Sequence, residues 1–229
     1  MNAPPSQSIV IHVDSAQTVD GLYLPAAQPK ACLVLAHGAG AGMTHPSMTT
    51  VAAELQALGV STVRYQFPYM QRGSKRTDAP PICHATVRAA VECATQLAPS
   101  QPLFAGGRSF GGRMTSQAQS LNPLPNVRGL VFLAFPLHPA GKPSDERAAH
   151  LTKIEIPMLF IQGSDDDLAS LDLLQPLMQR LGSRATLKLL EHADHSFHVP
   201  ARTGRRDPQV REEALRAAVD WMNSISDCA

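Results

Sequence analysis

The chain has 229 residues, of which 44% are hydrophobic, and this size predicts one domain, residues 1–229, around a single core. Its net charge of +1 gives no global field that would attract nucleic acid or an anionic membrane. No run of eighteen apolar residues exists, so we expect no membrane span. The first residues resemble no secretory signal, and the four cysteines lack metal-binding spacing, which favours a reducing cytoplasmic location.

The expected elements alternate between strands and helices along the chain. Strands are expected at 9–13, 21–24, 31–36, 61–67, 102–105, 127–135, 158–163 and 185–190. Helices are expected at 46–58, 82–97, 113–121 and 208–225, and residues 68–81 read as a long polar loop. This alternation predicts an α/β fold with a doubly wound, mostly parallel sheet of about seven or eight strands and helices on both faces.

The segment Gly107-Arg108-Ser109-Phe110-Gly111 has the G-x-S-x-G pattern and lies between an apolar run and a segment with helical character. A nucleophile at a sharp strand-to-helix turn has strained backbone angles, and the flanking glycines remove side chains that would clash. The helix N-terminus behind the serine favours developing negative charge. Ser109 is therefore the candidate nucleophile, with a glycine-rich turn whose serine caps a helix as the alternative.

A second glycine-rich segment, residues 38–42, follows the buried strand at 31–36. Acyl transfer needs two backbone N–H groups aimed at the oxyanion, one after the nucleophile and one from the loop after an early strand. We expect these donors at Phe110 and at Ala39 and Gly40. A dinucleotide-binding loop is the alternative, but the glycine spacing is not G-x-G-x-x-G and no acidic residue ends the next strand.

Candidate acid and base residues follow two later strands. Asp165, Asp166 and Asp167 come just after the strand at 158–163, and His195 follows the strand at 185–190. Serine, then aspartate, then histidine, each past the end of a strand, is the chain order of an α/β-hydrolase catalytic triad. The pattern leaves three aspartates as candidates for the acid.

Other polar residues near these motifs have weaker assignments. Arg108 flanks the nucleophile and is expected to be an exposed or ion-paired group, with contact to a substrate carboxylate as the alternative. His138 lies near the expected mouth of the site, where it could either touch substrate or have a surface role. His192, His195 and His198 are spaced by three, which suggests zinc, but no strong fourth ligand accompanies them. We therefore expect neither a metal nor a cofactor.

The segment between the strands at 127–135 and 158–163 is too short for a helical cap domain. We expect an open site without a cap, covered only by loops 68–81 and 136–157.

The chain resembles α/β-hydrolase-fold proteins of the dienelactone-hydrolase-like group, and within it the hydrolases related to testis-expressed protein 30. The resemblance implies Ser109 as nucleophile, Asp166 as acid and His195 as base. The chain departs from the family pattern, in which a single acid is followed by proline, because it has three aspartates and then Leu168. The matching stretches are HGAG (37–40), RYQFPY (64–69), GRSFGGRM (107–114), FLAFPLHPAGKP (132–143), FIQGSDD (160–166) and DHSF (194–197).

Two functions from different classes fit these features. The first is a serine hydrolase, a carboxylesterase on small acyl esters that works through an acyl-enzyme, with thioesters and amides as related substrates. The second is a hydrolase-fold protein-binding module with little or no turnover. The complete triad and oxyanion loop favour the enzyme, whose partner would be a small ester-type molecule rather than nucleic acid or a membrane. The pattern specifies no oligomeric state.

Overall fold

A single sheet runs through the centre of the computed structural model, which describes residues 4–227. Residues 1–3 and 228–229, the ends of the predicted domain, lie outside the described residues. Within residues 4–227 the sheet has eight strands, which are β1 (Gln7–His12), β2 (Thr18–Leu24), β3 (Ala31–Ala36), β4 (Val60–Tyr65), β5 (Leu103–Arg108), β6 (Val127–Leu133), β7 (Met158–Gly163) and β8 (Ala185–Leu190).

The strand order is β1-β2-β4-β3-β5-β6-β7-β8. β1 pairs antiparallel with β2, and β2 with β4, whereas the remaining neighbours pair parallel. The chain passes from β3 to β4 on one side and later returns to β5 on the other side of β3. Ligand sites of open α/β sheets form where the strand order reverses in this way, at the carboxyl ends of the strands. The sheet confirms the predicted doubly wound, mostly parallel fold.

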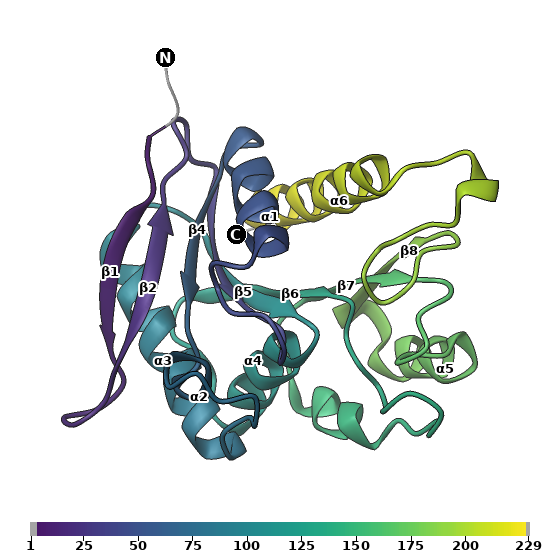
Figure 1. Cartoon of the computed structure of the whole chain (residues 1–229), viewed down its shortest axis with the longest axis horizontal. Coiled ribbons are helices and arrows are strands. Elements are labelled where there is room, and N and C mark those ends of the chain that lie inside the picture. The colour runs from purple at the N-terminus through teal and green to yellow at the C-terminus, as the bar shows by residue number, and fades with distance from the viewer. Residues whose placement is uncertain (1–3, 228–229) are drawn as a thin grey trace.

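Helices cover both faces of the sheet (Figure 1). α1 (Pro46–Ala57) and α6 (Asp207–Asp227) contact each other on one face. The opposite face carries α3 (Pro80–Leu97), α4 (Phe110–Leu121) and α5 (Leu171–Leu181). Within residues 4–227, no helix is both long enough and apolar enough to cross a lipid bilayer.

The two-sided cover explains the continuous apolar run that forms β3. All six of its residues are buried. Leu33 and Leu35 pack into the layer of α1 and α6, whereas Cys32 and Val34 pack into the layer of α3 and α4. Because alternate residues of a strand point to opposite faces, a strand buried on both faces shows no polar alternation.

The prediction of a long polar loop over residues 68–81 is wrong in part. A short helix, α2 (Pro68–Gln71), occupies its start, and α3 already begins at Pro80. In both helices proline stands in the first turn, where its missing N–H needs no partner and its fixed φ suits the helix. Pro68 and Pro80 therefore begin helices rather than mark a loop.

The connection between β6 and β7 contains the 3₁₀ helix η1 (Glu146–Lys153). η1 packs against α4 and α5 on the same face of the sheet and forms no cap domain. His150 fastens η1 to α4, since its Nε2 lies 2.7 Å from Ser116 Oγ, which itself donates to the Arg113 carbonyl. Burial, reinforced by the positive charge of Arg113, lowers the pKa of His150 to about 4.

This partly buried imidazole should make stability depend on pH. An unfolded histidine titrates near 6.5, so between pH 6.5 and about 4 the unfolded chain binds more protons than the folded one, and stability falls as the pH falls. Between pH 7 and pH 4.5, we expect the free energy of unfolding to fall by about 2 kcal/mol less in His150→Gln than in wild type. Urea unfolding at several pH values measures this, with the exposed His12→Gln as control. Equal losses in His150→Gln and wild type would contradict it.

Candidate active site

Ser109 lies at the turn between β5 and α4, with φ 49° and ψ −116°. A residue with a side chain seldom adopts this conformation, so the turn stores strain. Its hydroxyl makes no capping hydrogen bond to α4, and its N–H donates to the Leu133 carbonyl at 3.0 Å. The alternative of a helix-capping serine is therefore wrong, and the hydroxyl is left for other contacts.

Glycines on both sides of Ser109 allow the turn to pack against the end of β3. A Cβ atom on Gly107 would lie 2.4 Å from the Ala36 carbonyl oxygen. A Cβ atom on Gly111 would lie 2.5 Å from the His37 carbonyl oxygen. Real Cβ atoms do not approach backbone oxygens this closely, so the turn requires glycine at both positions.

His195 lies in the loop after β8 and joins Ser109 to Asp166. Its Nε2 lies 2.8 Å from Ser109 Oγ, and its Nδ1 lies 2.8 Å from Asp166 Oδ2. Since a carboxylate only accepts, the hydrogen-bond network assigns the proton of the neutral ring to Nδ1. Nε2 is then an acceptor aimed at the Ser109 hydroxyl.

The structure brings one of the three aspartates to His195. Asp166 is 3% exposed, whereas Asp165 and Asp167 are exposed. The Leu168 N–H donates to Asp166 Oδ1 at 2.8 Å, which fixes the second carboxylate oxygen. Tight turns of this kind give adjacent side chains different directions, so only Asp166 points inward.

Gln162 supports Asp166 and was not singled out from the sequence. It is fully buried in β7, its Nε2 donates to Asp166 Oδ2, and its Oε1 accepts the Phe135 N–H at 2.9 Å. The available signal was a polar residue within the apolar strand MLFIQG. A buried amide needs partners for both of its ends, and it finds them in the loop after β6 and in Asp166.

Hydrogen bonds from two side chains hold the loop after β3 in place. His37 Nδ1 donates to the Gly38 carbonyl at 2.7 Å, and its Nε2 accepts the Phe67 N–H at 3.0 Å. Burial lowers the pKa of His37, which favours the neutral ring that this pair of contacts requires. The Tyr69 hydroxyl donates to the Ala39 carbonyl at 2.9 Å.

These contacts also orient the N–H groups of Ala39 and Gly40. In a trans peptide the C=O and N–H point in opposite directions, so a carbonyl held toward His37 or Tyr69 turns the following N–H the other way. Ala39 and Gly40 line the cleft beside Ser109. Phe110 begins α4, where the first N–H groups of a helix have no partner within it. Ala39 and Gly40 thus share the cleft with Ser109, and Phe110 directly follows Ser109 in the chain.

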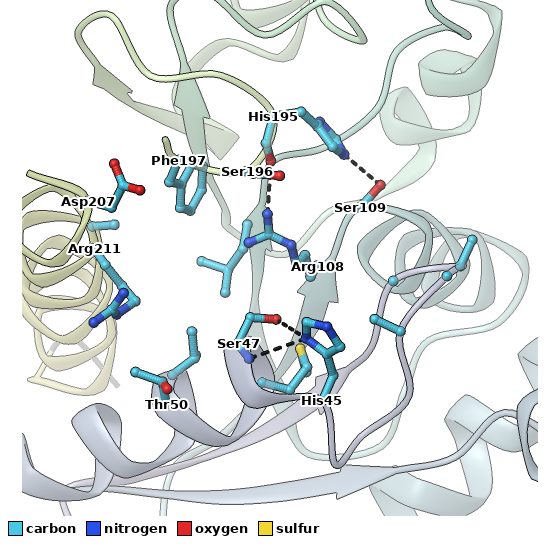
Figure 2. A pocket seen from close by; sticks show the side chains of 18 of the residues that line it. His45, Ser47, Thr50, Arg108, Ser109, His195, Ser196, Phe197, Asp207 and Arg211 are labelled. Carbon is cyan, nitrogen blue, oxygen red and sulfur yellow. Dashed lines mark hydrogen bonds between the residues drawn. The ribbon is translucent and has the colours of Figure 1, made fainter. Parts of the chain in front are cut away.

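A cleft of about 500 Å³ opens beside Ser109, between residues 38–41, α1 and α6. Figure 2 shows the Ser109 and His195 side chains at one end of it and Arg108 in its middle. Apolar side chains from both helices and from β6 line the walls. Its polar and charged lining residues are His45, Ser47, Thr50, Arg108, Ser109, His195, Ser196, Asp207 and Arg211.

His138 does not line this cleft, in contrast to its expected position near the mouth of the site. It is 3% exposed, and its ring contacts the Pro139 carbonyl through Nδ1 and the Ser170 N–H through Nε2. The N–H groups of residues 137 and 138 both donate to the Leu168 carbonyl. These bonds draw the turn inward, and His138 fastens the loop that follows Asp166.

The three evenly spaced histidines have separate surroundings. His195 contacts Asp166 and Ser109, His198 contacts Asp207 at 2.9 Å, and His192 is exposed. In the part of the chain that the structure describes, no three His, Cys, Asp or Glu side chains are grouped as metal ligands.

A family model described as an alpha/beta hydrolase domain matches residues 29–223. The chain belongs to the α/β-hydrolase family. This membership agrees with the strand order, the strained serine turn and the positions of Asp166 and His195 after β7 and β8.

Solved structures from three bacteria are similar over nearly the whole chain. A dienelactone hydrolase from Anabaena variabilis is 18% identical, with a TM-score of 0.78 over 96% of this chain and 97% of that one. An alpha-beta serine hydrolase homologue from Coxiella burnetii is 20% identical, with a TM-score of 0.74 over 92% and 96%. A serine hydrolase without lid from Xanthomonas campestris is 21% identical, with a TM-score of 0.73 over 96% and 98%. At these identities the likeness establishes the shared fold.

The glycine requirement of the serine turn can be tested by stability. We expect Gly111→Ala to lower the free energy of unfolding by about 3 kcal/mol, because the added methyl meets the backbone of β3. Gly40→Ala is the matched control, since a Cβ atom there meets nothing within 4 Å and should change stability by less than about 1 kcal/mol. Urea unfolding measures both, and equal stabilities of the two variants would show that the turn tolerates a side chain.

Proposed function

We propose that the protein is a serine hydrolase that cleaves small carboxylic esters through an acyl-enzyme on Ser109. The observation that carries the proposal is the chain of contacts from Asp166 through His195 to Ser109, 2.8 Å at each histidine nitrogen, beside an open cleft. Thioesters and amides would follow the same course through a tetrahedral intermediate. The narrower similarity to hydrolases related to testis-expressed protein 30 stays a prediction.

In the proposed acylation step, Ser109 Oγ attacks the ester carbonyl carbon as its proton passes to His195 Nε2. The imidazolium that forms is stabilised by the Asp166 carboxylate at Nδ1. Gln162 and the Leu168 N–H hold that carboxylate in place, so it does not need to reorganise during the reaction.

The carbonyl oxygen becomes an oxyanion as Ser109 attacks. We assign its stabilisation to the Phe110 N–H and to the N–H groups of Ala39 and Gly40. Each such donor is worth about 3 kcal/mol of transition-state stabilisation in acyl-transfer enzymes. The N-terminus of α4 adds a favourable field at the same point.

The intermediate then collapses as His195 returns its proton to the alkoxide leaving group, which departs as an alcohol. A water molecule then attacks the acyl carbonyl carbon as its proton passes to His195. The second tetrahedral intermediate collapses as His195 returns that proton to Ser109 Oγ, and the carboxylic acid departs. An uncapped cleft of about 500 Å³ suits a small acyl group better than a long chain, because little apolar surface of a long chain would be covered.

A fluorophosphonate probe tests the nucleophile directly. We expect one label per chain, on the Ser109 peptide, and none in Ser109→Ala. Ser116→Ala is a matched control, because Ser116 also contacts a histidine but lies within α4, where its hydroxyl donates to the Arg113 carbonyl and meets His150 of η1. Peptide mass spectrometry reads the position. Labelling that persists in Ser109→Ala would overturn the proposal.

The three aspartates offer a test of the acid. Asp166→Asn should lower kcat by about 10⁴, because the amide favours the wrong tautomer of His195. Asp165→Asn and Asp167→Asn serve as controls and should stay within about threefold of wild type, since exposed charges contribute little. Steady-state hydrolysis of a small aryl ester measures all three. Full activity in Asp166→Asn would refute its assigned role.

A further inference from the structure

Arg108 directly precedes Ser109, and its guanidinium places a positive charge in the cleft (Figure 2). Its Nη2 donates to the His195 carbonyl at 3.0 Å. Its guanidinium carbon lies 5.5 Å from the centre of the Phe197 ring. No carboxylate of residues 4–227 lies within ion-pair distance of it, since none of the ion pairs in this part of the chain includes Arg108. The charge therefore has no direct counterion.

The guanidinium is held in a way that leaves donors available. A guanidinium has five N–H groups, and the carbonyl of His195 takes one of them. Contact with the Phe197 ring fixes the plane of the group while its edge stays open to the cleft. A fixed guanidinium edge is suited to two parallel hydrogen bonds with a carboxylate.

The other charged side chains of the cleft already have partners. Arg211 forms a two-fold contact with Glu54, through Nε at 2.9 Å and Nη2 at 2.7 Å. Asp207 accepts hydrogen bonds from His198 and from the Val199 N–H. Among the described residues that line the cleft, Arg108 is thus the charged group without an ionic partner.

Burial favours an anionic ligand at this position. Desolvation lowers the pKa of Arg108, and the more distant carboxylates of Asp194 and Asp166 offset this only in part. Asp166 is engaged by His195 and Gln162, and Asp194 by backbone N–H groups of its own loop. A ligand carboxylate would compensate the partly buried charge directly.

We propose that the substrate is an ester that also carries a free carboxylate, such as a half-ester of a short dicarboxylic acid. Arg108 binds this carboxylate in the cleft while the ester carbonyl lies at Ser109. The inference rests on the proposed esterase function and names its substrate class.

Two matched substrates test the selectivity: the mono-4-nitrophenyl ester of glutarate, and the same ester with its free carboxylate methylated. Wild type should favour the charged ester by about tenfold or more in kcat/KM, as expected for a bidentate charged contact. In Arg108→Gln this ratio should fall to about one, and Arg108→Lys should keep part of it, because lysine retains the charge without the fork. Arg211→Gln is the control for a paired cation of the same cleft and should keep the wild-type ratio.

The ratio of the two kcat/KM values separates recognition of the substrate carboxylate from positioning of His195. Arg108 also holds the His195 backbone, so its loss could slow hydrolysis, but this effect would lower the rates of both esters alike. A wild-type ratio near one, or a ratio that survives in Arg108→Gln, would overturn the inference while leaving the esterase function standing.

Binding without turnover makes the two proposals distinguishable. In Ser109→Ala, the Kd measured by calorimetry should be at least about tenfold lower for monomethyl glutarate than for dimethyl glutarate. This preference should vanish when Arg108→Gln is added. This preference together with a wild-type protein that hydrolyses neither ester would support the carboxylate site and defeat the esterase function. Equal binding of the two compounds would defeat the carboxylate site.

Discussion

The close approach of the β5–α4 turn to the end of β3 is the constraint on which the site depends. Gly107 and Gly111 let the turn touch the backbone at Ala36 and His37, and the same contact forces Ser109 into a strained conformation. The strain is tolerated because β5 lies between β3 and β6, paired with both. One packing event thus exposes a hydroxyl and places it beside the loop that carries the candidate oxyanion donors.

Buried polar groups hold the remaining parts of the site. His37 and Tyr69 fasten the carbonyls of the loop after β3, and Gln162 joins Asp166 to the loop after β6. An unpaired polar group in these positions would cost about 1–3 kcal/mol, so each of these side chains must find its partner when the sheet edge forms. The same contacts that stabilise the edge therefore fix the directions of the groups proposed to react.

The fold and the candidate serine and histidine could be predicted because each depends on local pattern, whereas that pattern left three aspartates open and only the family resemblance pointed to Asp166. Apolar runs with glycine-rich ends mark buried parallel strands, and the ends of such strands meet at one edge. The partners of these residues were not predictable. Gln162 contacts Asp166, four positions away, and Tyr69 contacts Ala39, thirty positions away. His138 is buried because backbone hydrogen bonds to the Leu168 carbonyl hold its turn inward. Such contacts follow from the packed loops rather than from any local pattern.

The central claim concerns the position of one proton in the chain from Asp166 to Ser109. Nitrogen NMR of histidine-labelled protein, at a pH above the usual histidine titration range, distinguishes a proton on Nδ1 from one on Nε2. The His195 signals are assigned by their loss in His195→Gln. We expect the proton on Nδ1, and its transfer to Nε2 in Asp166→Asn. A wild-type His195 with its proton on Nε2 would contradict the claim, because that nitrogen could not accept the proton of Ser109.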